Sequence, residues 1–302
     1  MSVRLLKNNL TVNNKQEYKK PSAPRILGGI VAGDIVRRCA KKSFLFGAPK
    51  INQQLANLNN SITQDEFQTI NNSTQKALKT TGLDKKGVDI IKTSDENLES
   101  IIKITWKELN SGLGKYSTQE KKLATLNRQL YDFIEDSGIC FAKSSNKIIL
   151  PKNNHILGMF HEMGHALVNS SSFGKIISKS RNAFGLCVPI YLISMLKTKK
   201  AQGEEPKNKI DKAGDFVKNN AGKLAFLSFA PLLLDEGLAT IKGNKIAKEV
   251  LGENLAKKVA KANKLGFSTY ALLATCTSFG LFLSTKIKDK IAHNKVNQKA
   301  PT

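Results

Sequence analysis

The fold is decided by residues 151–168, PKNNHILGMFHEMGHALV. From His155 onward, apolar side chains recur at helical spacing, which predicts a helix that extends to Val168. The preceding residues 138–150, GICFAKSSNKIIL, contain two short β-rich runs around a Ser-Ser-Asn turn and predict a β-hairpin. The order of hairpin, loop and helix therefore indicates an α+β protein that is mainly α-helical.

Two histidines and a glutamate on this helix form the sharpest chemical signal in the chain, His161-Glu162-Met163-Gly164-His165. Residues four apart lie on one face of a helix, so both imidazoles can reach one metal ion. Glu162 would project beside that ion, where it can act as a general base. The pattern predicts a zinc (Zn2+) site with His161 and His165 as ligands and Glu162 as the catalytic residue. The alternative is a helix with two exposed histidines and an ordinary glutamate.

A catalytic zinc ion takes three protein ligands and leaves one position open for water. Of the other two histidines, His155 falls on the opposite side of the same helix and His293 lies in a basic tail. A carboxylate is therefore the expected third ligand. Glu236 follows an apolar run and should be held in the core, where a buried carboxylate needs a metal ion or an ion pair. Glu253 has the same Glu-x-x-Ala spacing, but its Lys-rich surroundings predict a solvated face.

The combination of His-Glu-x-x-His with a downstream Glu-x-x-Ala resembles the gluzincin metallopeptidases. The glycine in HEMGH and the apolar segments between the two motifs are similar to the membrane-associated group that contains the CAAX-prenyl and heat-shock quality-control proteases. The resemblance covers about residues 138–250 and implies a zincin-like core. It also implies that a strand near Lys147–Leu150 is the edge strand that pairs with an extended peptide substrate.

The resemblance further implies metal-assisted hydrolysis, in which zinc activates a water molecule and Glu162 moves its proton to the leaving amine. Two positions depart from the family pattern. Thr240 stands where an aspartate commonly supports a ligating histidine, and Ser170 stands where a further histidine often follows the first motif. Gluzincins usually add a Tyr, His or Arg that holds the oxyanion. Tyr191 and Tyr270 are candidates, but a tyrosine in an apolar run is more often a core residue or a membrane-interface anchor.

Four regions are predicted along the chain. Residues 1–55 are basic and Asn-rich and contain PSAP, which indicates a flexible leader. Residues 56–137 form a helical region of unknown role. Residues 138–264 form the metallopeptidase core with apolar insertions, and residues 265–302 form an apolar C-terminal helix and a basic tail.

Helices are expected within the second of these regions from caps and apolar stripes. Thr63 with Glu66, and Ser117 with Glu120, match the capping box that satisfies free N–H groups at a helix start. Apolar spacing predicts helices over Asp95–Leu109 and over residues 123–133.

Three uncharged runs, Asn182–Leu196, Leu224–Leu234 and Leu265–Thr285, suggest contact with a membrane. As a helix, the third run would reach roughly 30 Å, enough to cross a bilayer core. The first two are too short to cross and are expected as buried core helices, a re-entrant hairpin or interfacial segments. Lysines flank the third run on both sides, so the positive-inside rule assigns no orientation.

Composition excludes several classes of protein. With 302 residues, 40% hydrophobic and 24% charged, the chain is neither a stapled miniprotein nor wholly disordered. Forty-eight Lys and Arg against 24 Asp and Glu leave a net charge of +24, which implies a nucleic-acid or anionic membrane partner. Nucleic acid is disfavoured because no zinc-finger spacing or RNP-type aromatic motif is present. Lysines beside apolar runs are expected for helices that meet anionic lipid headgroups.

The cysteines and the N-terminus indicate the compartment. Cys39, Cys140, Cys187 and Cys276 form no CxxC pair and are expected to be buried, reduced thiols. The basic N-terminus is not followed by a signal-type apolar core. We expect a membrane-associated protein with a reducing cytoplasmic face and no cleaved signal peptide.

Three functions follow, in order of preference. The first is a membrane-associated zinc metallopeptidase that acts on a peptide or protein substrate. The second is a catalytically inactive, metal-binding scaffold at the membrane surface. The reason to consider it is Thr240, which stands where the family commonly has an aspartate. The third is a charge-driven nucleic-acid binder.

Overall fold

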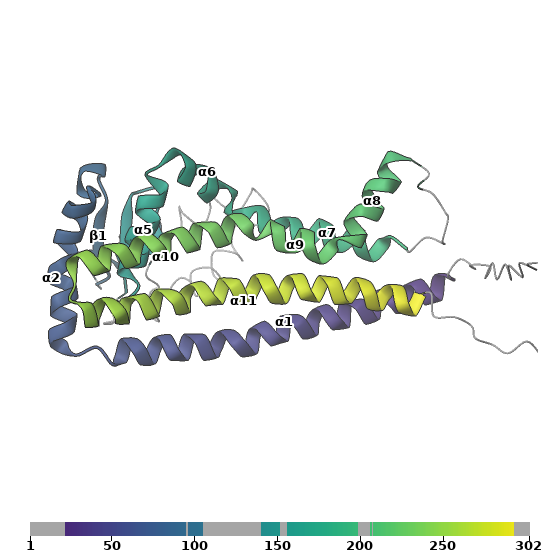
Figure 1. Ribbon diagram of the computed structural model, residues 1–302, viewed down its shortest axis with the longest axis horizontal. Helices are drawn as coiled ribbons and strands as arrows, with labels where there is room; N and C mark the ends of the chain where they lie inside the picture. The colour runs from purple at the N-terminus through teal and green to yellow at the C-terminus, as the bar shows by residue number, and fades with distance from the viewer. Residues whose placement is uncertain are drawn as a thin grey trace, which may run out of the picture.

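The structure is a computed structural model that describes residues 22–94, 96–104, 140–151, 156–198, 206 and 208–292 of the chain. Two long antiparallel helices, α1 (Ala23–Asn60) and α11 (Glu253–Ala292), run side by side along the molecule (Figure 1). Helix α10 (Ala230–Val250) lies along α11, and α2 (Gln64–Thr81) crosses one end of this bundle together with a small sheet. The described part of the chain is mainly helical, as predicted.

Small residues let α1 and α11 approach each other closely. A Cβ added to Gly29 would lie 2.7 Å from the carbonyl oxygen of Lys288, and one added to Gly33 would lie 2.9 Å from that of Ser284. Glycines four residues apart therefore form the contact face of α1. The prediction of a flexible leader over residues 1–55 is wrong from Ala23 onward. The glycines of this segment have a low helix propensity, but packing against α11 stabilises the helix in spite of it.

Helix α2 begins at the predicted capping box. The Thr63 hydroxyl accepts a hydrogen bond from the Glu66 backbone N–H, and the Glu66 carboxylate accepts one from the Thr63 N–H. Gly82, with a left-handed φ of 66°, ends the helix.

Other expected helices fall partly or wholly outside the described residues. Residues 98–104 are helical, within the predicted Asp95–Leu109 helix, and the remainder of its C-terminal part is not described. The second capping box and the helix over residues 123–133 also lie outside the described residues.

The predicted hairpin is confirmed, but its place in the sheet is not. Strands β2 (Cys140–Ala142) and β3 (Lys147–Leu150) pair antiparallel. A third strand, β1 (Asp89–Lys92), pairs parallel with β3, so the order is β1-β3-β2 in the described sheet. The expectation that Lys147–Leu150 is an edge strand is therefore wrong, because β3 is central. The four residues of β1 are too few to show a period in the sequence.

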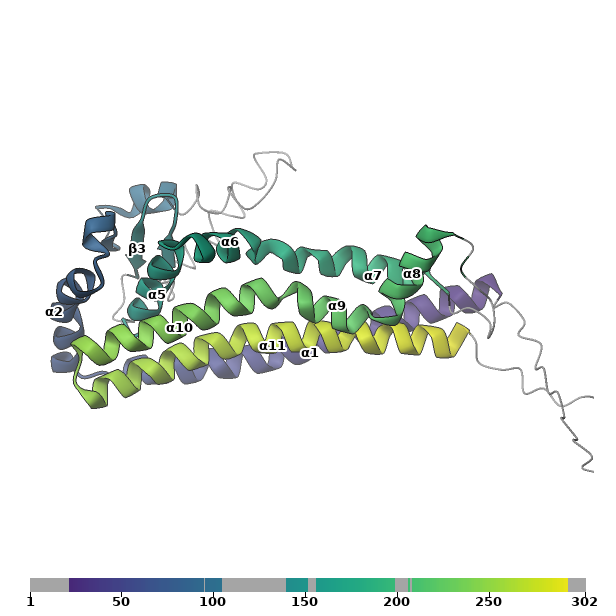
Figure 2. The same ribbon diagram turned by 45° about the horizontal axis from the view of Figure 1, so that its top comes forward.

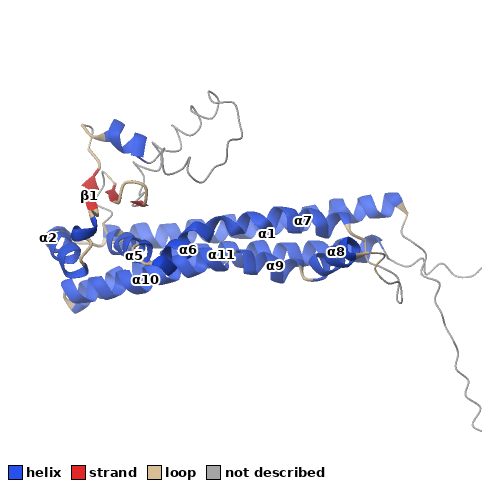
Figure 3. Cartoon of the chain, turned by 90° about the horizontal axis from the view of Figure 1, so that it is seen from above, coloured by secondary structure: helices blue, strands red, loops and turns tan. Residues whose placement is uncertain are grey.

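The remaining elements lie along the bundle. They are η1 (Asp84–Lys86), α5 (Met159–Asn169), α6 (Ser172–Ser180), η2 (Arg181–Leu186), α7 (Cys187–Leu196), α8 (Lys209–Asn219) and α9 (Ala221–Ser228). Figure 3 shows the strands grouped beside one end of the helices. Helix α5 begins at Met159 rather than near the predicted start at His155.

Two stretches of the described chain are long and apolar enough to cross a membrane, Ala221–Val250 and Glu253–Ala292. The second contains the predicted run Leu265–Thr285. The first joins α9 to α10, so the run Leu224–Leu234 belongs to a longer apolar segment than its own length suggests. The predicted region boundaries at 55/56 and 264/265 fall inside α1 and α11, so neither is a structural boundary.

The four cysteines are not joined by disulfides. Cys39 is exposed and the other three are half-buried, so the expectation of fully buried thiols is wrong.

Candidate metal centre

The helix that carries HEMGH crosses α10 closely because each helix has a glycine at the crossing. A Cβ added to Gly164 would lie 2.1 Å from the carbonyl oxygen of Ala239. One added to Gly243 would lie 2.4 Å from the carbonyl oxygen of Phe160. Real Cβ atoms essentially never approach below 3.0 Å, so these glycines set the separation of α5 from the helix that carries Glu236.

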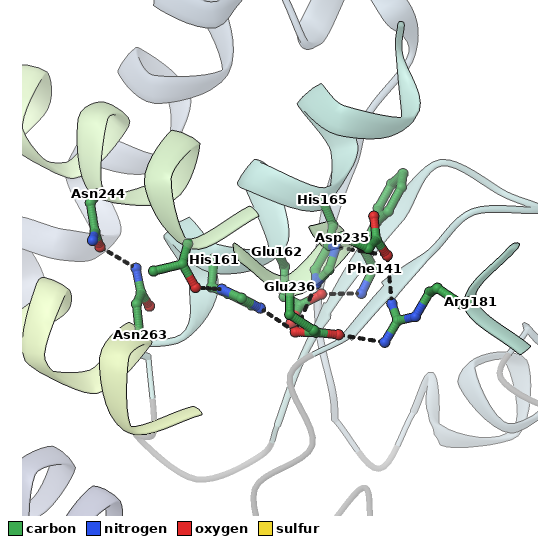
Figure 4. Close-up of polar contacts among 10 residues, drawn as sticks. Phe141, His161, Glu162, His165, Arg181, Asp235, Glu236, Asn244 and Asn263 are labelled. Carbon is green, nitrogen blue, oxygen red and sulfur yellow. Dashed lines mark hydrogen bonds and ion pairs between the residues drawn. The ribbon is translucent and has the colours of Figure 1, made fainter. Parts of the chain in front are cut away.

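This close crossing brings together the three ligands expected from the sequence, as Figure 4 shows. The Nε2 atom of His161 lies 3.1 Å from Oε2 of Glu236, and the Nε2 atom of His165 lies 3.5 Å from the same oxygen. One ligand atom from each residue lies within 4.8 Å of the other two. Two ligands of a tetrahedral zinc ion, each about 2.05 Å from it, lie roughly 3.3 Å apart. The donor set and two of its spacings therefore fit such an ion.

Each imidazole also has an oxygen atom facing its other ring nitrogen. Thr240 Oγ1 lies 3.3 Å from His161 Nδ1, and Asp235 Oδ2 lies 3.6 Å from His165 Nδ1. The threonine that departs from the gluzincin pattern thus contacts one of the two candidate ligand histidines directly. Only the Thr240 contact is within hydrogen-bond distance, and a hydrogen bond of this kind orients an imidazole and sets its tautomer.

Arg181, which sequence reasoning missed, joins the two carboxylates of the site. It donates a hydrogen bond of 2.9 Å to Asp235 Oδ2 and another to Glu236 Oε1. Only 1% of each carboxylate side chain is exposed, so both need a cationic partner. The available signal was residue type: Arg181 is the one arginine after Arg128 in a Lys-rich chain, and arginine suits paired carboxylates better than lysine.

The carboxylates also control the charge of His165. Burial opposes its protonation, but Asp235 and Glu236 outweigh burial and raise the pKa of His165 to about 9. The two buried carboxylates therefore lie between the His165 imidazole and the Arg181 guanidinium. Binding of a metal ion would displace the proton from His165.

Glu162, the predicted catalytic residue, contacts the sheet. Its Oε2 atom accepts a hydrogen bond of 2.8 Å from the backbone N–H of Phe141 in β2. The carboxylate therefore lies between α5 and β2, beside His161 (Figure 4). Its contact with β2 could not be read from the sequence because the residues are 21 positions apart.

The other candidates lie elsewhere. Glu253, at the start of α11, is 81% exposed and pairs with Lys257, as expected for a solvated face. Tyr191 donates a hydrogen bond of 2.8 Å to Asp34 in α1 rather than reaching the ligands. Ser170 ends α5, where its hydroxyl bonds to the carbonyl of the preceding turn. His155 and His293 lie outside the described residues.

Tyr270 comes closer to the site than the sequence indicated. It packs against Phe229 and Leu232 at the start of α10, and it interacts electrostatically with Arg181 and Glu236. It is therefore a neighbour of the carboxylate cluster.

Comparisons with known proteins find no match. Neither a protein-family model, nor a curated protein, nor a solved structure matches the chain. The functional assignment therefore depends on the residues and geometry described above.

Proposed function

We propose that this chain is a zinc-dependent, membrane-associated metallopeptidase of gluzincin type. The observation that carries the proposal is the convergence of His161, His165 and Glu236 beside Glu162. Two imidazoles and one carboxylate form a known ligand set for catalytic zinc, which keeps a fourth position for water.

Each residue of the site would have a separate role in hydrolysis. A zinc ion held by the three ligands would lower the pKa of a water molecule and polarise a peptide carbonyl. Glu162 would accept the proton of that water and deliver it to the leaving amine. Thr240 and Asp235 would orient the imidazoles, and Arg181 would hold the far oxygen of Glu236.

Because β3 is central, we propose that β2 rather than β3 is the edge strand that pairs with an extended peptide substrate. Within the described sheet β2 has β3 on one side only. Its Phe141 N–H points to Glu162 rather than into the β3 ladder. An extended peptide that pairs with this side of β2 would lie next to the base.

Membrane association is supported by where polar and apolar side chains lie in the bundle. Polar side chains are buried between helices, including Ser194, Ser278 and Ser284, while Phe279 and Phe282 of α11 are exposed. Small and polar contacts inside, with large apolar side chains outside, are typical of helices packed in lipid. The two long apolar helices support the same proposal.

Zinc analysis tests the metal centre. We expect about one zinc ion per chain in the wild type, loss of zinc in His161→Ala and Glu236→Ala, and retention in Glu162→Gln. Glu253→Ala, which removes an exposed glutamate in the same Glu-x-x-Ala spacing, is the matched control and should retain zinc. A wild-type protein that binds no zinc would refute the proposal.

Activity separates the peptidase from a metal-binding scaffold. Cleavage of an unfolded protein should be abolished by a chelator and by Glu162→Gln, while zinc content in that variant stays unchanged. A zinc-loaded chain without any such cleavage would support the scaffold. Tight binding of DNA or RNA that weakens steeply with salt would instead support the nucleic-acid function.

A further inference from the structure

Large apolar side chains are exposed on three consecutive elements along the bundle, α6, η2 and α7. Figure 2 shows α6 and α7 following one another over α10 and α9. Six large apolar side chains on these elements are between 51% and 73% exposed: Phe173, Ile176, Leu186, Val188, Leu192 and Leu196. We call these six residues the outer apolar strip.

The exposed apolar side chains of α7 recur with a helical period. Their exposure therefore means that one face of this helix points away from the bundle. In α7, Val188, Leu192 and Leu196 recur every four residues along one face. Ser194, on the other side of α7, and Met195, at its flank, are buried against the bundle. In a protein surrounded by water, the large side chains would be expected on the buried face and the serine on the exposed face.

Basic residues predominate in the sequence of the elements that carry the strip. Between Glu162 and Glu204 the sequence contains six Lys and Arg residues and no Asp or Glu. Lys175 and Lys179 are exposed on α6, one turn apart and beside Ile176. Lys197 follows α7 directly and pairs with Asp211 of α8. Exposed lysines beside large apolar side chains are typical of helices that lie in the headgroup region of a bilayer.

We infer that the outer apolar strip, with Lys175 and Lys179, docks on the surface of an anionic lipid bilayer. Its apolar side chains enter the boundary between headgroups and acyl chains, and the two lysines pair with lipid phosphates. Lipid phosphates complement the positive charge of Lys175 and Lys179, whereas a second copy of the chain carries the same net charge of +24. Neither α6 nor α7 needs to cross the bilayer, and their nine and ten residues are too short to do so.

The inference extends the proposed membrane association and is independent of the metal ligands. Docking would, however, bring lipid close to the metal centre, because Arg181 begins η2 between the two halves of the strip. Arg181 bonds to both Asp235 and Glu236.

Tryptophan fluorescence of the full chain tests the inference. The chain has a single tryptophan, Trp106, so Trp106→Phe provides a silent background. Into it we would introduce Leu192→Trp or Phe173→Trp, both at exposed positions of the strip. Lys76→Trp, at an exposed position of α2 and outside the strip, is the matched control. Each variant is mixed with vesicles of phosphatidylcholine and phosphatidylglycerol in equal amounts, with and without bromine on the acyl chains near the headgroup.

We expect the brominated lipid to lower the emission of the two strip variants by about half and to leave the Lys76→Trp variant unchanged. Adding Lys175→Glu and Lys179→Glu to the Leu192→Trp variant should raise the lipid concentration needed for half-maximal quenching by about tenfold. All these variants should keep the zinc content of the wild type, which separates this test from that of the metal centre.

Two results would overturn the inference. The first is emission from positions 192 and 173 that brominated lipid does not quench more than emission from position 76. The second is quenching that is equally strong in vesicles of phosphatidylcholine alone. A blue shift that depends on protein concentration without lipid would show that a second copy covers the strip, and this would also overturn it.

Discussion

Gly164 offers the most direct test of how the fold builds the metal centre. In Gly164→Ala, the new Cβ would lie 2.1 Å from the Ala239 carbonyl oxygen, and contacts below 3.0 Å are essentially never seen. Helices α5 and α10 would therefore have to separate by about 1 Å. The two proposed histidine ligands lie on α5 and Glu236 lies on α10, whereas metal–ligand distances tolerate only about 0.2 Å.

The magnitude follows from two opposing contributions. Overpacking a tight contact costs about 1–3 kcal/mol, whereas replacing a helical glycine with alanine stabilises by up to about 1 kcal/mol. Gly237→Ala is the matched control, because it lies in α10 beside Glu236 and its new Cβ would meet only Phe267, at 3.7 Å. Gly237→Ala gains the higher helix propensity of alanine but has no steric overlap with a neighbouring backbone. The two variants should therefore differ in free energy of unfolding by about 2 kcal/mol.

Thermal unfolding in chelator measures the stability difference, and competition with a chromophoric chelator measures zinc affinity. We expect Gly164→Ala to unfold about 4 °C or more below Gly237→Ala and to bind zinc at least about tenfold more weakly. If Gly164→Ala matches the control in both measurements, the close crossing of α5 and α10 does not set the ligand geometry.

The other predictions concern the neighbours of the ligands and the frame of the bundle. Thr240→Val should weaken zinc binding about tenfold because His161 loses its Nδ1 partner, while Thr240→Ser should keep it; equal affinities in chelator competition would contradict this role. Arg181→Ala should lower the free energy of unfolding in chelator by about 3 kcal/mol, because two buried carboxylates lose their cation, and denaturant titration would show otherwise if the midpoint did not move. Thr63→Ala should cost about 1 kcal/mol through loss of the α2 cap, with Thr69→Ala on the exposed part of α2 as the control in the same titration. Hydrogen bonds from Arg37, Tyr191 and Arg38 lower the pKa of Asp34 to about 2, so Asp34 stabilises the fold above its unfolded pKa of 3.8, and this contribution is lost as pH falls through about 2. Asp34→Asn should therefore be less stable than the wild type by about 1 kcal/mol at pH 7, with the gap closing towards pH 2.5, and a gap that does not depend on pH would refute the ion pairs.

The local chemistry of the site was readable from sequence because it depends on short spacings. His161, Glu162 and His165 share one helix, and a spacing of four residues places both imidazoles on one face in any α-helix. The Thr63 and Glu66 cap and the β2-β3 hairpin were readable for the same reason, since their partners are only a few residues apart. Glu236 could be named because an acidic residue after an apolar run needs a partner once it is buried.

Tertiary structure decided everything that depends on distant residues. The backbone of Phe141 meets Glu162, and the guanidinium of Arg181 meets Asp235 and Glu236 more than 50 positions away. The short strand β1 made β3 central rather than an edge, and packing on α11 turned most of the expected leader into a helix. By itself, the sequence determined which groups could bind a metal ion, through the spacing of two histidines on one helix and the expected burial of Glu236 on another. Only the close crossing of α5 and α10 decided that they meet, because that contact depends on the absence of Cβ atoms at Gly164 and Gly243, where backbones from distant parts of the chain touch.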